Sequence, residues 1–153
     1  KDVSNLTHAH PISILGCYIY TTIVFDILDS LDKAEIMENL KHFDSKIPDE
    51  YRRWLKEYDF NDNYFISNGY VADSLKIAVW GFNNSKDIKD CIYKIASLGG
   101  DTDTNCAIGG SLAGLYYGLW GENITFDDEV VKKNVILELI DKFINIIKVY
   151  LLV

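Results

Sequence analysis

The chain from Leu98 to Gly118 has the sequence Leu-Gly-Gly-Asp-Thr-Asp-Thr-Asn-Cys-Ala-Ile-Gly-Gly-Ser-Leu-Ala-Gly-Leu-Tyr-Tyr-Gly. The pair Gly99-Gly100 predicts the end of a preceding helix, because consecutive glycines favour a turn. We expect a new helix to begin near Asp103 or Thr104 and to run to about Trp120. Glycines recur at every fourth position along one face of this helix; they are Gly110, Gly114 and Gly118. Because an interior Gly costs about 1 kcal/mol relative to Ala, this row predicts close packing against a neighbouring helix.

Apolar residues at three- and four-residue spacing predict further helices on both sides of this stretch. The first follows Pro11, continues to about Leu31, and is expected to be buried around most of its circumference. Four more precede the glycine pair: Lys33 to about Lys46 with Ser30 or Asp32 as its cap, Asp49 to Tyr58, Tyr70 to Phe82, and Lys86 to Leu98 with Ser85 as its cap. The last begins near Phe126, where Thr125 and Asp128 resemble a capping box. With no strand pattern, the sequence predicts an all-α, compact multi-helix bundle of six or seven helices, a single domain over residues 1–153.

Length and charge narrow the classes of function. The chain has 153 residues, of which 48% are hydrophobic, and this suits one domain with its own core. Its net charge of −8 argues against nucleic-acid binding, which depends largely on clustered Lys and Arg. An anionic nucleotide remains a suitable ligand where a metal ion or a helix N-terminus supplies the positive charge.

Cysteine usage and hydropathy predict where the protein works. Cys17, Cys91 and Cys106 are odd in number and far apart, so we expect reduced thiols and a cytoplasmic protein. The uncharged stretch from Ile12 to Phe25 is shorter than the roughly 20 apolar residues of a membrane span, and it contains hydroxyl side chains. We therefore expect a core helix there and no membrane partner.

The residues after the glycine pair predict either a metal site or a helix cap. Asp101 and Asp103 flank Thr102, so that both carboxylates and the Thr104 hydroxyl can converge on one point. Hard cations such as Mg²⁺ and Ca²⁺ prefer oxygen ligands of this kind. An acidic residue before a helix is also a common N-cap that favours the positive end of the helix. The residue types alone leave both interpretations open.

Two other metal sites are excluded because ligands are missing. An EF-hand loop that began at Asp101 would place Cys106 where a Gly must turn and Leu112 where a bidentate Glu must coordinate. A zinc site built on His8 and His10 lacks a Cys or a third His at suitable spacing.

Three segments together resemble one protein family. The run from Leu98 to Gly118 resembles the signature of the ADP-ribosylglycohydrolase family, which includes the dinitrogenase-reductase-activating glycohydrolases. Leu6–Pro11 is similar to the Thr-His motif that opens a core helix of that family, and Asn68–Leu75 is similar to the stretch before the helix that precedes the signature. The resemblance spans about residue 4 to residue 120. Cys106 stands where the family commonly has a small residue such as Ala.

The resemblance implies an all-α fold that holds two Mg²⁺ ions, or Mn²⁺ in some members. Asp101, Asp103 and Thr104 match the C-terminal ligand set of the family. A Thr-Asp-Asp motif with the remaining ligands, and the catalytic acid or base, belong to an N-terminal half of the family. The nearest similar run here, Thr125-Phe126-Asp127-Asp128, has the wrong spacing. We therefore expect this chain to be the C-terminal portion of a longer domain.

The resemblance also implies contacts with the substrate. His8 is expected near ADP-ribose, Tyr70 near the adenosine or ribose, and Gly100 in the ligand turn. The ordinary alternatives stay open, since a His at a helix start is often a cap or surface residue and a Tyr before an apolar helix is often a core residue.

The reaction implied is metal-dependent hydrolysis of the glycosidic bond between ADP-ribose and a protein side chain or small-molecule acceptor. Such cleavage passes through an oxocarbenium-like transition state, and metals would orient the ribose hydroxyls and the attacking water. The expected partner is an ADP-ribosylated protein or a small molecule that contains ADP-ribose. Two alternatives remain: a truncated or inactive ADP-ribose-binding protein of the same fold, and a purely structural helical protein that responds to no metal.

Overall fold

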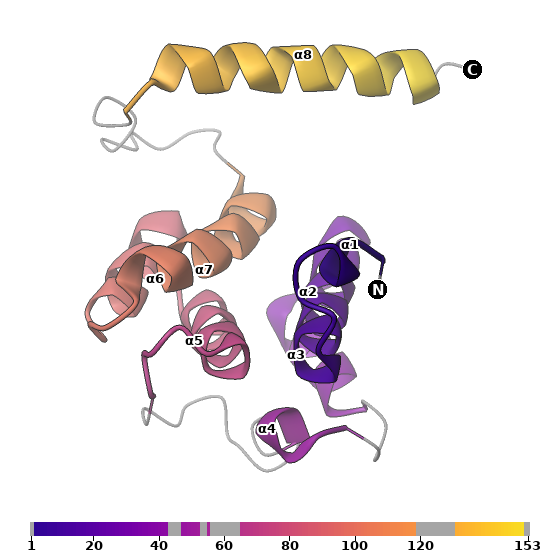
Figure 1. The fold of residues 1–153 in the computed structure, drawn as a ribbon. Coiled ribbons are helices and arrows are strands. Elements are labelled where there is room, and N and C mark those ends of the chain that lie inside the picture. The colour runs from indigo at the N-terminus through magenta and orange to yellow at the C-terminus, as the bar shows by residue number, and fades with distance from the viewer. Residues whose placement is uncertain (1, 43–46, 53–54, 56–64, 119–130, 152–153) are drawn as a thin grey trace. The chain divides into compact units, whose positions relative to one another are not determined.

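The computed structural model describes residues 2–42, 47–52, 55, 65–118 and 131–151 (Figure 1). These residues form eight helices and no strand, so the predicted all-α class is confirmed. The chain divides into two compact units, residues 1–118 and residues 119–153. The first contains α1 (Asp2–Asn5), α2 (Pro11–Leu28), α3 (Lys33–Lys41), α4 (Asp49–Arg52), α5 (Val71–Asn83), α6 (Ile88–Ala96) and α7 (Thr102–Tyr117). The second contains α8 (Lys133–Leu151).

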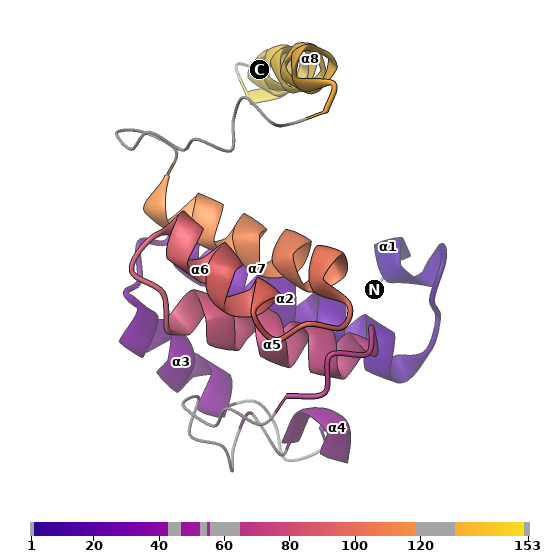
Figure 2. The same ribbon diagram turned by 90° about the vertical axis from the view of Figure 1, so that its left-hand side faces the viewer.

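Helices α5, α6 and α7 pack side by side, and two glycines set how closely they approach (Figures 1 and 2). Ile95 of α6 lies between Gly81 of α5 and Gly109 of α7. A Cβ atom added at Gly81 would lie 2.4 Å from Ile95 Cγ1, and one added at Gly109 would lie 2.3 Å from Ile95 Cδ1. The side chain of Ile95 therefore occupies space that exists only because both positions lack a Cβ atom.

The prediction that Gly110, Gly114 and Gly118 make the close contact with a neighbouring helix is wrong. Gly110 would bring a Cβ atom only to ordinary contact distance, 3.5 Å from Ile92, and Gly114 has open space around it. Gly118 lies outside α7, at a φ of +72°, where it ends the helix. The close approach falls instead on Gly109, because its face of α7 is the one turned toward α5 and α6.

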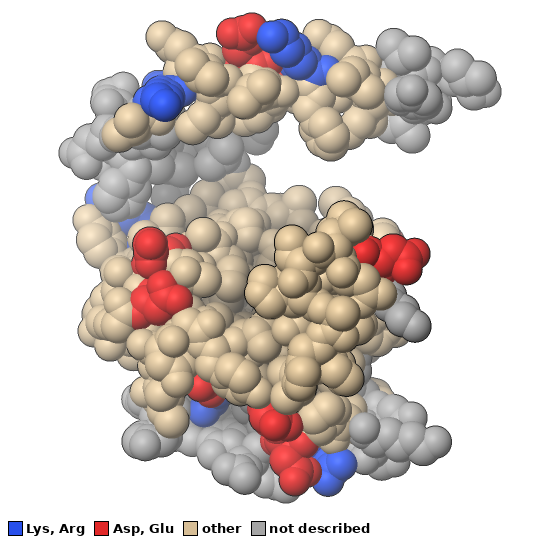
Figure 3. All heavy atoms as spheres, viewed as in Figure 1, with Lys and Arg blue, Asp and Glu red and all other residues tan. Residues whose placement is uncertain are grey.

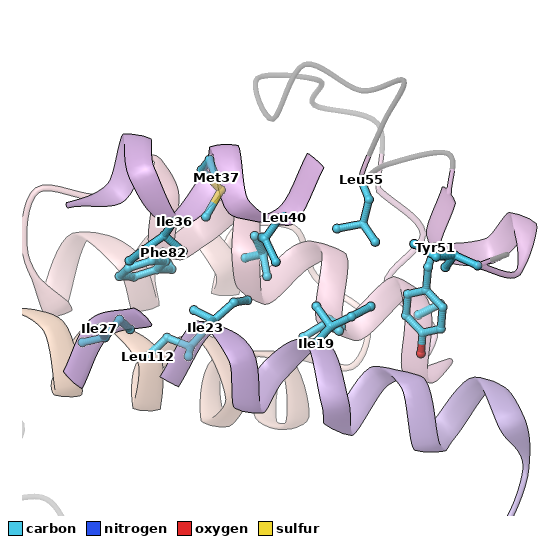
Figure 4. Close-up of a cluster of buried hydrophobic side chains, with 14 residues drawn as sticks. Ile19, Ile23, Ile27, Ile36, Met37, Leu40, Tyr51, Leu55, Phe82 and Leu112 are labelled. Atoms are coloured by element: carbon cyan, nitrogen blue, oxygen red, sulfur yellow. The ribbon is translucent and has the colours of Figure 1, made fainter. Parts of the chain in front are cut away.

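A second core joins α2, α3, α5 and α7 (Figure 4). Ile19, Ile23 and Ile27 of α2 are buried on a single face, together with Gly16. The prediction that α2 is buried around most of its circumference is therefore wrong, since Tyr18 is 62% exposed and other apolar residues on α2 are exposed as well. The reason is that α3, α5 and α7 all use the same face of α2.

Helix α2 also has the length and composition of a membrane-spanning helix. Among the described residues it is the one helix of at least 18 residues that is apolar enough, with a mean hydropathy of 1.6. A core helix meets the same criteria, and the burial of Ile19 and Ile23 shows that one face of α2 is in fact part of a protein core.

The helix ends differ in part from the predictions. Asp32 caps α3 through a capping box with Glu35, as one of the two predicted caps. Asp87, not Ser85, caps α6, by accepting the Asp90 N–H at 2.7 Å; Ser85 is buried and donates to the Phe82 carbonyl instead. The predicted helix ends near Lys46 and Tyr58 and the predicted cap at residues 125–128 lie outside the described residues.

Lys33 joins the start of α3 to the end of α5. Its Nζ donates to the carbonyl oxygens of Phe82 and Ser85, each at 2.6 Å, and to the Tyr117 hydroxyl at 2.5 Å. The same ammonium lies over the rings of Phe82, Tyr116 and Tyr117 at 4.9 to 5.6 Å from the centroids. A cation at the C-terminal end of a helix is stabilised by the carbonyls there, which have no partner within the helix.

Lys33→Met is expected to destabilise the protein by on the order of 2–3 kcal/mol, because it leaves half-buried carbonyl groups without their charged donor. Thermal unfolding measures the effect. Lys41→Met is the matched control, since Lys41 is exposed and its ion pair among the described residues is with Glu38 of the same helix. A variant pair with equal melting temperatures would contradict the role given to Lys33.

Two glycines of α7 with different surroundings should respond in opposite directions to alanine. Gly114→Ala is expected to stabilise by up to about 1 kcal/mol, because it adds helix propensity in open space. Gly109→Ala gains the same propensity but places a Cβ atom 3.3 Å from the Ala78 backbone and against Ile95, so a net loss of about 1–2 kcal/mol is expected. Chemical denaturation of the two variants tests this difference, and equal stabilities would show that the packing described for Gly109 is incorrect.

Candidate functional site

The candidate site is a turn made possible by two left-handed glycines. Gly99 and Gly100 have φ values of +71° and +67°, a conformation that side-chain-bearing residues rarely adopt. The Thr102 N–H donates to the Gly100 carbonyl at 2.9 Å, and the Asn105 N–H donates to the Asp101 carbonyl at 3.2 Å. The chain therefore leaves α6 and enters α7 within a few residues, with Asp101 at the N-cap position.

Ser67, in the segment before α5, forms hydrogen bonds with this turn. The Ser67 hydroxyl donates to the Gly99 carbonyl at 2.6 Å, and the Ser67 carbonyl accepts the Asp101 N–H at 3.3 Å. The Asn105 side-chain amide donates to the Ser67 hydroxyl at 2.9 Å. Gly100 passes so close that an added Cβ atom would lie 2.0 Å from the Ser67 carbonyl oxygen. Two segments more than 30 residues apart in sequence are thus joined at the backbone.

The two carboxyl groups of the turn lie together and only one of them caps the helix. Asp101 stands at the N-cap of α7, yet its side chain makes no capping hydrogen bond. Asp103 accepts the Thr104 N–H at 3.0 Å. A hydrogen bond from the Asp101 carboxyl, followed by backbone N–H groups, lowers the pKa of Asp103 below its usual value. Capping therefore accounts for Asp103 in part but leaves the Asp101 carboxyl unexplained.

The donor atoms of this turn fit a hard divalent cation. Two carboxylates and the exposed Thr104 hydroxyl are all oxygen ligands, the kind that Mg²⁺ and Mn²⁺ prefer. Next to them, Asn105 is buried, and its Oδ1 atom has no hydrogen-bond partner among the described residues. Among the described residues, no three His, Cys, Asp or Glu side chains lie close enough together to hold a metal ion. The turn would therefore supply only part of an octahedral shell.

The structure places the predicted substrate residues in two locations. Gly100 is in the turn, and Tyr70 directly follows Gly69, whose Cα lies against the Asp101 carboxyl. Tyr70 is the N-cap residue of α5, is 40% exposed, and donates its N–H to the Asn68 side chain. His8 is exposed on the connection between α1 and α2, where its ring nitrogen lies 3.0 Å from the Thr7 hydroxyl. No hydrogen bond joins His8 to the turn among the described residues.

Three residues at the site were not predicted: Ser67, Gly69 and Asn105. Asn105 directly follows the ligand run, and Gly69 lies within the Asn68–Leu75 segment, but neither residue type predicts a contact with Asp101. Cys106, which departs from the family pattern, donates its thiol to the Ile92 carbonyl at 3.6 Å, so it faces α6 and leaves the turn undisturbed.

A largely apolar groove of about 780 Å³ runs along α2, α5 and α7. It begins beside Tyr70, at Val71, and continues past Leu75 and the Ala107–Ser111 face of α7. The Tyr20 and Ser111 hydroxyls lie 2.8 Å apart and join α2 to α7 within its lining. On the face shown in Figure 3, most described side chains of residues 1–118 are neither acidic nor basic.

Comparison with known proteins relates this geometry to a family. The model of the ADP-ribosylglycohydrolase family matches residues 1–148. ADP-ribosylarginine hydrolase Tri1 of Pseudomonas putida is 36% identical over 72 residues, which are 43% of this chain and 19% of that protein. The ADP-ribosyl-[dinitrogen reductase] glycohydrolase of Rhodospirillum rubrum is 23% identical over 116 residues, 76% of this chain and 37% of that protein. The chain spans well under half the length of these relatives. No solved structure matches it.

Proposed function

The chain belongs to the ADP-ribosylglycohydrolase family, and on this basis we propose that its Asp101 turn binds a divalent cation at which a bond to ADP-ribose is hydrolysed. The observation that carries the proposal is the position of the Asp101 carboxyl, which makes no capping hydrogen bond and lies against Asp103. Two adjacent carboxylates repel each other unless a proton or a cation lies between them. A cation ligand set explains why both acidic residues are present.

The proposed substrate is an ADP-ribosylated protein or a small molecule that contains ADP-ribose. The names of the relatives from P. putida and R. rubrum give ADP-ribosylarginine and ADP-ribosylated dinitrogen reductase as what those proteins act on. We extend only the common part, the ADP-ribose group, to this chain. The acceptor on the other side of the bond is left as either a side chain or a small molecule.

Three residues of the turn share one proposed task, which is to hold the cation. Asp101, Asp103 and Thr104 would hold Mg²⁺ or Mn²⁺, with two ions expected in a complete site. The cation, when bound, would orient the ribose hydroxyls and the attacking water. As cation ligands, Asp101 and Asp103 would organise the reaction and would not transfer protons.

Two further residues would contact the substrate. Gly100 is an exposed residue of the turn, and its backbone would contact the substrate there. The half-exposed ring of Tyr70 would lie against the adenosine or ribose. His8 remains a proposed ADP-ribose contact from the connection that precedes α2. The cysteines are unpaired, and we propose a cytoplasmic location, where thiols stay reduced.

Binding of ADP-ribose without hydrolysis is the second candidate function. The observation in its favour is that the described residues bring only two carboxylates to the turn. A site with so few protein ligands leaves most of the cation shell to water, which favours weak binding.

Asp103→Ala is expected to abolish hydrolysis and to remove the rise in melting temperature that Mn²⁺ causes, while the metal-free protein stays folded. Asp141→Ala is the matched control, since Asp141 is an exposed residue of α8 and its loss changes the net charge equally. Release of ADP-ribose from an ADP-ribosylarginine peptide and thermal unfolding with and without Mn²⁺ measure both effects. Normal turnover in Asp103→Ala would remove the metal role. A melting temperature that rises with Mn²⁺ in the absence of turnover would favour the binding function instead.

A further inference from the structure

The segment before α5 contacts the turn that carries the proposed cation ligands at several points. Ser67 contributes two of them, one through its hydroxyl to Gly99 and one through its carbonyl to the Asp101 N–H. Gly69 contributes a third contact, because its Cα lies against the Asp101 carboxyl group. The segment therefore fixes both the backbone and the side chain of the same residue.

The contact at Gly69 leaves no room for a side chain. A Cβ atom built there would lie 2.5 Å from Oδ2 of Asp101, closer than real Cβ contacts. Gly69 also has a φ of +75°, so its conformation suits glycine for a second reason. The Asp101 carboxyl therefore occupies the space that a side chain at position 69 would fill.

Asn105 adds a hydrogen bond from the other side, at a place where an apolar residue would be expected. It is 1% exposed in the first turns of α7, and its amide nitrogen donates to the Ser67 hydroxyl. Its Oδ1 atom is buried and has no partner among the described residues. A buried acceptor without a donor costs stability, so the residue needs a reason to be polar.

We propose that Ser67, Gly69 and Asn105 are positioning residues that hold the Asp101 carboxyl in the orientation that binds the cation. This inference rests on the proposed function of the turn and assigns it a supporting layer of residues. Hydrogen-bonded neighbours of metal ligands commonly set ligand orientation, and their loss weakens metal binding by about 10- to 100-fold. The Oδ1 atom of Asn105 is then the acceptor that remains for a water molecule at the site.

The sharpest test compares two glycines that share a positive φ and differ in surroundings. Gly69 and Gly118 have φ values of +75° and +72°, so alanine strains the backbone at each position. Gly69→Ala places an atom against the Asp101 carboxyl, whereas Gly118 lies at the other end of α7 from Asp101. We expect both variants to melt a few degrees lower without metal, and Gly69→Ala alone to bind Mn²⁺ at least tenfold more weakly by isothermal titration calorimetry.

A second pair of variants tests the same proposal if backbone strain unfolds a glycine-to-alanine variant. Ser67→Ala is expected to weaken Mn²⁺ binding about tenfold, and Ser67→Thr, which keeps the hydroxyl, is expected to restore it. Ser97→Ala is the control, because the Ser97 hydroxyl, at the C-cap of α6, donates to the Lys94 carbonyl and makes no hydrogen bond to the turn among the described residues.

The outcomes separate this inference from the function on which it rests. Wild-type protein that binds no Mn²⁺ in the titration would overturn the proposed cation site itself. Wild-type protein that binds Mn²⁺, with Gly69→Ala and Ser67→Ala binding equally well, would leave the cation site standing and overturn the positioning role.

Discussion

The contact between the Gly100 backbone and the Ser67 carbonyl is the constraint on which the site depends. Its closeness requires a residue without a Cβ atom at position 100, and the left-handed conformation of Gly99 and Gly100 requires glycine there as well. Once these two residues are fixed, Asp101 must begin α7 beside the segment that precedes α5. The Ser67 hydrogen bonds and the contact of Gly69 with the Asp101 carboxyl follow because the turn and the segment before α5 lie side by side.

Helix packing away from the turn keeps the two segments in register. Because Ile95 lies between Gly81 and Gly109, α6 is fixed against both α5 and α7, and α6 leads directly into the turn. Lys33 acts at the other end of the same helices, where it joins the end of α5 to Tyr117 near the end of α7. Gly81 and Gly109 thus allow α5, α6 and α7 to pack closely, and the Lys33 ammonium links the C-terminal ends of α5 and α7.

The sequence predicted those features that depend on neighbours along the chain. The all-α class followed from periodicity, and the turn followed from Gly99-Gly100. The proximity of Asp101 and Asp103 followed from adjacency, whereas the convergence of the Thr104 hydroxyl with them stays a prediction. The family resemblance added Tyr70, which the structure places next to Gly69, and His8, which it places on a separate connection.

The features that sequence reasoning missed all depend on tertiary contacts. Periodicity selected Gly110 and Gly114, yet which face of α7 meets α6 is set by the packing of Ile95 against Gly109. In the same way, the apolar spacing from Ile12 to Leu31 predicts burial around most of the helix, whereas α2 buries one face because its neighbours share that face. Ser67 and Asn105 are ordinary polar residues in sequence, and only the fold brings them to the turn.

Paramagnetic broadening of amide NMR signals by substoichiometric Mn²⁺ tests the central claim most directly, because it locates the cation without requiring turnover. The proposed site predicts that broadening concentrates on residues 67–70 and 99–105 and spares the acidic surface of α3 around Glu38. Broadening that centres on Glu38 or another exposed carboxylate, with the signals of Gly69 and Asp103 unchanged, would show that the Asp101 turn does not bind the cation.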